Sequence, residues 1–313
     1  MNEWKRKHLL GLRYLERQEI ELILDSARAF KEVSEREVKK VPALRGKTVV
    51  NLFFEPSTRT KTSFELAAKR LSADLVNFSS STSSLVKGES ILDTLKNLEA
   101  YSIDIFVIRH SFSTAALYLS QHTSSSVINA GDGQNEHPTQ ALLDMFTIRE
   151  RLGTLENLKV AIIGDILHSR VARSNIWGLS KFSSTVYVCG PATLIPKYFD
   201  SLPCKITYSL KEALQDCNAV IMLRIQKERM GEQYFSSERE YTNYFSLSQD
   251  NLKYLPSKAL VMHPGPVNWD IEIASFLKER VSPLILEQTT NGLAIRMAVL
   301  YLLSEEKKYE ITD

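Results

Sequence analysis

The sequence predicts an α/β protein with two doubly wound domains, each a parallel sheet flanked by helices. Short apolar strands and amphipathic helices alternate along nearly the whole chain, a pattern typical of parallel sheets. The length of 313 residues, with 43% hydrophobic content, is more than one domain usually holds. The alternation also starts again after Gly153, which places a division near residue 150.

The first domain is expected over residues 1–150, with a C-terminal segment, 288–313, that packs back on it. Apolar residues at helical spacing from Leu12 to Phe30 predict its first helix. Apolar strands are then predicted at 48–54, 75–78, 103–108 and 127–129. Helices are predicted from Ser57 or Thr58 through Arg70, and at 90–99, 114–121 and 138–152.

The second domain is expected over residues 151–287. Its strands are predicted at 159–163, 185–188, 219–223 and 259–262, with a helix at 171–181 and a terminal helix at 290–303. The polar stretch 227–251 is longer than most connections in compact domains. It fits a mobile loop over a site, and it fits equally well an excursion that contains a short helix.

Charge and cysteine content narrow the classes of function. The 39 basic and 37 acidic residues give a net charge of +2, which argues against a broad nucleic-acid or membrane surface. The three cysteines, Cys189, Cys204 and Cys217, show no CxxC spacing, so we expect no disulfide framework and a reducing compartment. We recognise no signal peptide and no stretch long enough to span a membrane, and we expect a soluble, cytoplasmic protein.

The most informative motif is Ser57-Thr58-Arg59-Thr60, which lies where the first strand becomes a helix. Pro56 stops the strand, and Ser57 or Thr58 can cap the helix. The first amides of a helix have no partner within it, and with the helix dipole they attract an anion. Hydroxyls and a guanidinium add bonds to phosphate oxygens. The simpler alternative is an ordinary helix cap with solvated charges.

Two more strand ends in the first domain carry polar groups. Arg109 follows an apolar strand, at the edge where doubly wound sheets bind ligands. His137 ends a Gly-rich loop just before a helix, where an imidazole can donate to a carbonyl oxygen, although a lone histidine is more often structural. Neither a P-loop nor the GxGxxG spacing is present, so nucleotide binding is disfavoured.

In the second domain, Arg170 and Arg224 each follow a predicted strand. Two guanidinium groups suit a dicarboxylate, since each can bind one carboxylate with two parallel bonds. The alternative is a solvated charged loop, the usual fate of such runs. Lys87 in a flexible turn, and Gly265-Pro266 after a strand, indicate little by themselves.

Three motifs in this order resemble the aspartate/ornithine transcarbamoylase family: Ser57-Thr58-Arg59-Thr60, His137-Pro138-Thr139-Gln140 and His263-Pro264-Gly265-Pro266. Within it, two further runs resemble the catalytic chains of the bacterial aspartate branch: Arg224-Ile225-Gln226-Lys227-Glu228-Arg229 and Lys87-Gly88-Glu89. Ornithine-specific members typically carry cysteine where this chain has Gly265. The resemblance covers nearly the whole chain.

The resemblance implies a first domain that binds carbamoyl phosphate, a second that binds L-aspartate, and catalysis in the cleft between them. It implies a homotrimer in which a neighbouring subunit donates Ser83 and Lys87, and no metal or organic cofactor. The product would be N-carbamoyl-L-aspartate, an intermediate of pyrimidine biosynthesis. Whether regulatory chains or dihydroorotase associate with the trimer stays open.

The resemblance also implies roles for individual residues. Those assigned to catalysis are Arg59, Thr60, Lys87, Arg109 and His137. Those assigned to carbamoyl phosphate are Ser57, Thr58, Arg59, Thr60, Arg109, His137, Gln140, Gly265 and Pro266, with Ser83 and Lys87 of the neighbouring subunit. Those assigned to aspartate are Lys87, Arg170, Arg224 and Gln226.

Three positions depart from the family pattern: Trp269 and Lys61 stand where relatives often have arginine, and Val86 stands where enteric relatives have lysine. They bear on loop closure and affinity and remove no assigned residue. The nearest rival is a family member that uses another amine, such as ornithine. A non-catalytic subunit is disfavoured because the expected polar residues are all present. A nucleotide-binding regulator is disfavoured because neither the P-loop nor the GxGxxG fingerprint is present.

Overall fold

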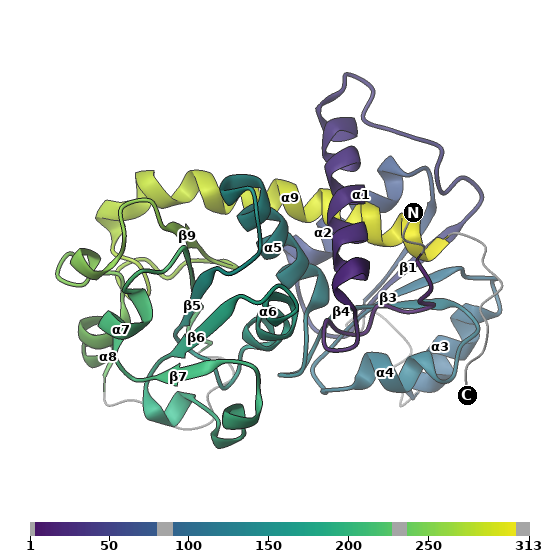
Figure 1. The fold of residues 1–313 in the computed structure, drawn as a ribbon. Coiled ribbons are helices and arrows are strands. Elements are labelled where there is room, and N and C mark those ends of the chain that lie inside the picture. The colour runs from purple at the N-terminus through teal and green to yellow at the C-terminus, as the bar shows by residue number, and fades with distance from the viewer. Residues whose placement is uncertain (1–3, 80–89, 227–236, 305–313) are drawn as a thin grey trace. The chain divides into compact units, whose positions relative to one another are not determined.

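The computed structural model describes residues 4–79, 90–226 and 237–304 (Figure 1). The chain forms two compact units, residues 1–143 with 290–313, and residues 144–289. The divisions lie inside α5 (Pro138–Leu152) and α9 (Lys278–Ser304). The sequence places them close by, at 150/151 and 287/288.

The first unit contains a parallel four-stranded sheet in the order β2-β1-β3-β4. Its strands are β1 (Thr48–Phe53), β2 (Asp74–Ser79), β3 (Ile105–His110) and β4 (Ser126–Asp132). Its helices before α5 are α1 (Arg17–Glu35), α2 (Thr58–Arg70), α3 (Ile91–Glu99) and α4 (Ala115–Ser120). Val50 pairs with Val76 on one side and Phe106 on the other. Val50 and Phe106 are fully buried, so burial of apolar side chains stabilises the sheet.

Several predicted element limits in this unit differ from the structure: β3 lies two residues later than the predicted strand 103–108, and α1 and β4 differ more clearly. Leu12 and Leu15 precede α1, which begins at Arg17 after a capping box formed by Glu16 and Glu19. Both leucines are buried, so their spacing reflects packing of an irregular segment. The sequence predicts a loop from residue 130, but strand β4 continues to Asp132. The glycine and polar residues there continue the β-sheet pairing instead of ending it.

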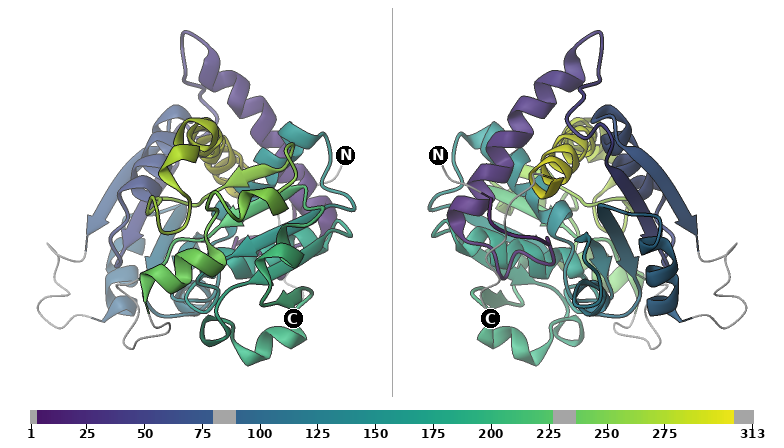
Figure 2. Two further views of the ribbon diagram at one scale, coloured as in Figure 1. Left: turned by 90° about the vertical axis from the view of Figure 1, so that its left-hand side faces the viewer. Right: turned by 90° about the vertical axis from the view of Figure 1, so that its right-hand side faces the viewer.

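The last turns of α9 belong to the first unit. The rings of Phe30 in α1 and Tyr301 in α9 are 5.6 Å apart, edge to face. The hydroxyl of Ser126 donates to the carbonyl of Leu303 at 3.3 Å. The views of Figure 2 show the purple α1 and the yellow end of α9 side by side. The predicted return of the terminal helix to the first domain is therefore confirmed.

The second unit contains a parallel five-stranded sheet in the order β7-β6-β5-β8-β9. Its strands are β5 (Lys159–Ile163), β6 (Thr185–Cys189), β7 (Lys205–Thr207), β8 (Ala219–Met222) and β9 (Leu260–Met262). Its helices between α5 and α9 are α6 (Arg170–Ser180), α7 (Leu210–Leu214) and α8 (Glu238–Phe245). The sequence missed β7 and α7, since three and five residues show no clear period. Helix α8 lies in the polar stretch 227–251, whose residues 227–236 are outside the described part.

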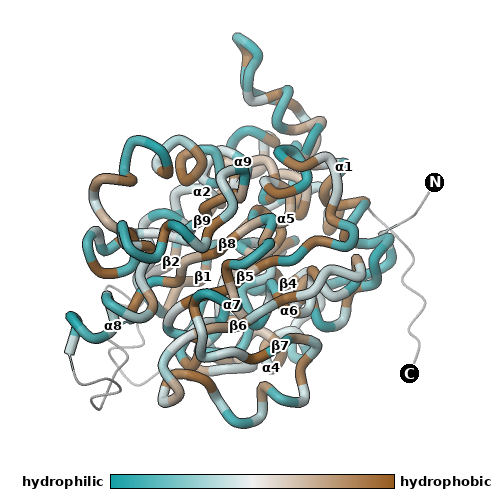
Figure 3. The backbone as a smooth tube through the Cα atoms, turned by 60° about the vertical axis from the view of Figure 1, so that its left-hand side comes forward, coloured by the Kyte–Doolittle hydropathy of each residue, from teal (hydrophilic) through white to brown (hydrophobic). Residues whose placement is uncertain are grey.

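Helix α9 is longer than predicted because it continues through Pro283. The sequence predicts a start at residue 290, after this proline. A proline near the start of a helix removes few hydrogen bonds, so the helix can begin before it. Figure 3 shows apolar segments along β1, β5 and β8, and an alternation of polar and apolar residues along α1. Within the described residues, no helix has both the length and the apolar character needed to cross a membrane.

Candidate functional site

Strand β1 ends before Glu55 and Pro56, and α2 starts at Thr58 with Ser57 at its N-cap. Ser57 is the N-cap residue, one of the two predicted for this position, but its hydroxyl accepts no capping hydrogen bond. The first intrahelical bond runs from the amide of Lys61 to the carbonyl of Ser57 at 3.0 Å. The amides before Lys61 therefore have no acceptor within the helix, and they form, with the exposed Arg59, a place for an anion.

Arg109 lies at the end of β3, the strand that pairs with β1. Its side chain is largely buried, donates to Glu55 at 2.9 Å and to the carbonyl of Ala130 at 3.3 Å. The amide of Phe54 donates to the carbonyl of Arg109 at 2.9 Å. Because β1, β3 and β4 are neighbours, this guanidinium lies at the same sheet edge as the start of α2.

Asp132, at the end of β4, holds the loop that leads to His137. Its carboxylate accepts from the amide of Thr114 at 2.7 Å, from the side chain of Asn129 at 2.8 Å and from the amide of Glu136 at 3.1 Å. Burial raises the pKa of Asp132, while these hydrogen bonds oppose the rise. Gly133, in the same loop, has φ +47°, and an added Cβ would lie 2.6 Å from the backbone of Ser113.

Glu136 fixes this loop against the N-terminal segment. Its carboxylate accepts from the amides of Leu12 at 2.7 Å and Arg13 at 3.3 Å. His137 follows as a buried residue directly before α5, and the amide of Gln140 donates to its carbonyl at 3.0 Å. The structure thus brings the start of α2, Arg109 and the loop of His137 to the ends of three adjacent strands.

In the second unit, β5 and β8 are hydrogen-bonded neighbours, and Ile163 pairs with Met222. Arg170, which follows β5, is the first residue of α6 and is 6% exposed. Arg224 follows β8. A buried cation adds to the positive potential at the amino end of a helix, and this arrangement favours an anionic ligand.

Gln226 connects the two strand ends. Its side-chain amide donates to the carbonyl of His168 at 3.1 Å, and its backbone amide donates to Asp165 at 3.3 Å. Asp165 also lies 2.8 Å from Nδ1 of His168. The buried carboxylate of Asp165 therefore fixes the backbone around both predicted aspartate-binding segments.

Glu272 holds the turn that contains Gly265 and Pro266. This fully buried carboxylate lies 3.0 Å from Nε2 of His263 and accepts from the amides of Asn268 at 2.7 Å and Ile225 at 2.8 Å. The turn, which contains a cis Gly265–Pro266 peptide, is thus tied to the segment after β8. Trp269 lies nearby, with Nζ of Lys278 5.9 Å from its ring centroid.

Three predicted features fall outside the described residues: Ser83 and Lys87, the departure at Val86, and the charged run from Lys227 to Arg229. Their roles therefore stay predictions.

The three cysteines are not suited to nucleophilic catalysis. Burial raises the pKa of Cys189 to about 12 and the pKa values of Cys204 and Cys217 to about 11, so their thiols stay protonated at neutral pH. Within the three described ranges, no group of three or more His, Cys, Asp or Glu side chains could hold a metal ion.

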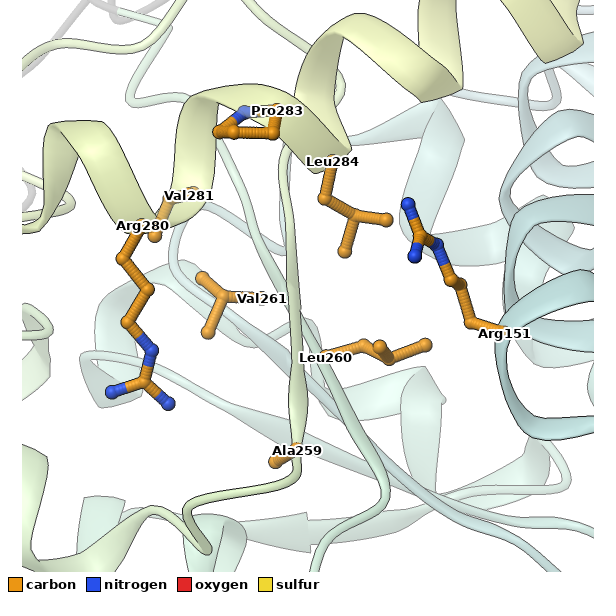
Figure 4. Close-up of a pocket in the computed structure, with 8 residues that line it drawn as sticks. All are labelled: Arg151, Ala259, Leu260, Val261, Arg280, Val281, Pro283 and Leu284. Carbon is orange, nitrogen blue, oxygen red and sulfur yellow. The ribbon is translucent and has the colours of Figure 1, made fainter.

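A cavity of about 270 Å³ lies elsewhere in the second unit, between β9 and the start of α9 (Figure 4). Its wall is mainly apolar, with Val261, Pro283 and Leu284 among its residues, and two arginines. Arg151 is paired with Glu287, and Arg280 donates to the carbonyl of Ser257 at 3.1 Å. None of the predicted site residues lines this cavity.

Comparison with known proteins identifies the family. Residues 7–150 match the family model described as aspartate/ornithine carbamoyltransferase, carbamoyl-P binding domain, and residues 156–303 match the Asp/Orn binding domain of the same family. The chain belongs to the aspartate/ornithine carbamoyltransferase family. The carbamoyltransferase resemblance inferred from the three sequence motifs is thereby confirmed.

Similar carbamoyltransferases cover almost the full length of the chain. The aspartate carbamoyltransferase catalytic subunits of Syntrophus aciditrophicus and Halothermothrix orenii are each 55% identical, over 96% of this chain and 98% and 96% of theirs. The Trypanosoma cruzi aspartate transcarbamoylase solved with carbamoyl phosphate and aspartate has a TM-score of 0.84 at 29% identity, covering 95% and 97%. The M. jannaschii catalytic subunit has a TM-score of 0.82 at 33% identity, covering 95% and 98%.

Several carboxylates of this carbamoyltransferase were not predicted from sequence as site residues: Glu55, Asp132, Glu136, Asp165 and Glu272. Each follows or adjoins a strand end or turn and accepts hydrogen bonds from backbone or from cationic side chains. Acidic residues in loops usually read as solvated charges. The only available signal was their position beside the predicted cations.

Proposed function

We propose that this chain transfers the carbamoyl group of carbamoyl phosphate to the amine of L-aspartate, forming N-carbamoyl-L-aspartate and phosphate for pyrimidine biosynthesis. Its relatives at about 55% identity are aspartate carbamoyltransferase catalytic subunits. A related structure with the same fold was solved with N-(phosphonacetyl)-L-aspartic acid, a compound that joins a phosphonate to an aspartate. In this proposal the first unit binds carbamoyl phosphate and the second binds aspartate.

The assignment of aspartate as the second substrate rests mainly on two arginines at neighbouring strand ends, Arg170 and Arg224. Gln226 lies two residues after Arg224. Its side-chain amide donates to the carbonyl of His168, two residues before Arg170, and its backbone amide donates to Asp165. Two guanidinium groups and an amide suit the two carboxylates of aspartate. The ammonium group of ornithine would meet repulsion from the same cations.

For the phosphate end, we assign Ser57, Thr58, Arg59 and Thr60 at the start of α2. The amides at the start of the helix, the hydroxyls and a guanidinium can surround phosphate oxygens there without a metal ion. We assign Gln140, Gly265 and Pro266 to contacts with the carbamoyl amide, because a side-chain amide and turn carbonyls can pair with an N–H group.

For the chemical step, we assign Thr60, Arg109 and His137 to the carbamoyl oxygen. The uncharged amine of aspartate attacks the carbonyl carbon, a C–N bond forms and a tetrahedral oxyanion develops. The C–O bond to phosphate then breaks, phosphate leaves with the bonding pair, and the nitrogen releases a proton. Donors held in place before the reaction stabilise the oxyanion more than the ground state.

We further propose a cytoplasmic homotrimer in which Ser83 and Lys87 of one subunit complete the site of its neighbour. Lys87 would offset charge on the departing phosphate and contact an aspartate carboxylate. This assignment comes from the family resemblance. Association with regulatory chains or dihydroorotase needs a separate binding measurement.

The test is a steady-state assay of the purified protein with carbamoyl phosphate, in which L-aspartate and L-ornithine are supplied in parallel reactions. Phosphate release and carbamoyl product are both followed. We expect turnover with aspartate alone. Turnover with ornithine alone would contradict the assignment of Arg170 and Arg224, and binding without turnover would favour a non-catalytic subunit.

A further inference from the structure

Arg296, in α9, is a buried cation that the reaction described above does not use. The residue is 5% exposed. In the described part of the chain, its single hydrogen bond runs from Nη1 to the hydroxyl of Ser63 at 3.0 Å, and its Nε has no partner. Its guanidinium carbon lies 5.3 Å from the ring centroid of Phe64.

Neighbouring residues hold this guanidinium against α2. Phe64, fully buried in α2, offers the face of its ring, a weak partner for a cation. A Cβ added at Gly292, one turn earlier in α9, would lie 2.6 Å from Nη1 of Arg296. Glycine in a helix interior is less stable than alanine, and here its missing side chain leaves the space that the guanidinium occupies.

The charge of Arg296 is not balanced by a nearby carboxylate among the described residues. Burial lowers its pKa to about 10, and no opposing charge in the described ranges raises it, so the side chain is still cationic at neutral pH. An unpaired buried charge is costly in free energy. A ligand that brings negative charge to the same region would recover part of this cost.

Ser63 is six residues after Ser57, the N-cap of α2. At 1.5 Å per residue, the guanidinium therefore lies on the order of 9 Å along the helix from its amino end. At an effective dielectric constant of about 20, a unit charge at this separation corresponds to a gain of roughly 10- to 20-fold in affinity for a bound monoanion. The helix amides, Arg59 and Arg296 would act on the anion in the same sense.

We propose that Arg296 is a positioning residue for the anion site, which holds the second turn of α2 through Ser63 and supplies a fixed positive charge behind it. The inference rests on the proposed function, because it assigns that site to carbamoyl phosphate. Arg296 is remote from the reacting carbonyl, so it stabilises bound substrate and transition state alike. Loss of such uniform binding raises KM and leaves kcat nearly unchanged.

The experiment compares Arg296→Met, which keeps length and removes charge, with Arg296→Lys, which keeps the charge. Arg70→Met is the matched control, because Arg70 also donates to a serine hydroxyl, Ser34 at 2.8 Å, but from the other end of α2. Each protein is titrated with inorganic phosphate by calorimetry and assayed for the KM of carbamoyl phosphate and for kcat.

For Arg296→Met we expect about tenfold weaker phosphate binding, a similar rise in the KM of carbamoyl phosphate, and kcat within about twofold of wild type. Arg296→Lys should restore most of the affinity, and Arg70→Met should bind phosphate as wild type does. If Arg296→Met does not fold, Ser63→Ala removes the positioning hydrogen bond and should raise the KM of carbamoyl phosphate about threefold.

Unchanged phosphate affinity in Arg296→Met, or equal losses in the lysine and methionine variants, would overturn the inference and leave Arg296 as a packing residue. The proposed function fails in a different way, if the wild-type protein does not carbamoylate aspartate. The phosphate titrations can be read in either case.

Discussion

The guanidinium of Arg109 lies 2.9 Å from the carboxylate of Glu55. The two side chains come from neighbouring strand ends and are 10% and 20% exposed, so solvent screens their interaction only partly. The ion pair orients one of the groups that we assign to the carbamoyl oxygen. It also keeps a carboxylate next to a proposed anion site.

Glu55→Gln is expected to lower kcat about tenfold, because Arg109 loses the charged partner that orients it. The lost repulsion between Glu55 and the substrate works in the opposite direction, so the KM of carbamoyl phosphate should change little. Steady-state kinetics with both substrates varied separates the two parameters. A kcat equal to that of wild type would show that Glu55 does not orient Arg109 for catalysis.

Glu272→Gln is expected to destabilise the protein by about 2–4 kcal/mol. The carboxylate accepts hydrogen bonds from two backbone amides and from the side chain of Asn268, and it contacts His263. The NH₂ group of a glutamine side chain cannot accept these hydrogen bonds and would face some of the donors. Denaturant unfolding measures the loss. Glu279→Gln, an exposed change in the first turn of α9, is the control and should cost less than about 1 kcal/mol. Equal losses would refute the role of Glu272.

The lowered pKa of His8 predicts that the stability of the protein depends on pH. Burial, with a smaller effect of Lys7, lowers its pKa to about 4, and its Nδ1 accepts from the amide of Val127 at 3.1 Å. The unfolded chain binds a proton near pH 6.5 and the folded chain only near pH 4. The contribution of neutral His8 is thus complete above pH 6.5 and is lost as the pH falls toward 4.

His8→Asn keeps an acceptor and removes the titration. Between pH 7.5 and pH 5, the unfolding free energy of wild type should fall by about 2 kcal/mol more than that of the variant. Urea unfolding at both pH values provides the comparison. Parallel losses in the two proteins would show that His8 is not responsible.

Subunit mixing tests the proposed contribution of Lys87 to a neighbouring site. Lys87→Ala and Arg59→Ala each remove one component of the proposed shared site, so each variant by itself should retain below about 1% of activity. In a mixed trimer, a subunit with intact Arg59 can receive Lys87 from its neighbour. We expect activity to reappear after the two inactive proteins are mixed under conditions that exchange subunits. Activity that stays at the level of the separate variants would exclude shared sites.

The architecture could be predicted because each domain repeats a clear period. Strands such as β1 and β5 are mainly apolar over six and five residues, and helix α5 begins at a proline, a strong local signal. Helix α7 and strand β7 have five and three residues, too few for a period to be visible. The start of α9 was hidden by Pro283.

The candidate cations could be predicted from their positions at strand ends, since parallel strands bring these ends to one edge. The carboxylates that organise them could not. Asp132 and Glu272 accept hydrogen bonds from backbone amides that are distant in sequence, such as those of Thr114 and Ile225. Only the tertiary structure brings these donors together, so the sequence gives no local pattern for them.

The central claim is that the start of α2 binds the phosphate end and the arginines of the second unit bind aspartate. The most direct measurement is the KM of each substrate in Arg59→Ala and Arg224→Ala. Arg59→Ala should raise the KM of carbamoyl phosphate about 10- to 100-fold and change the KM of aspartate little. Arg224→Ala should raise the KM of aspartate by about 30-fold or more and leave the KM of carbamoyl phosphate nearly unchanged. An Arg224→Ala variant with wild-type KM for aspartate, or an Arg59→Ala variant with wild-type KM for carbamoyl phosphate, would contradict the account.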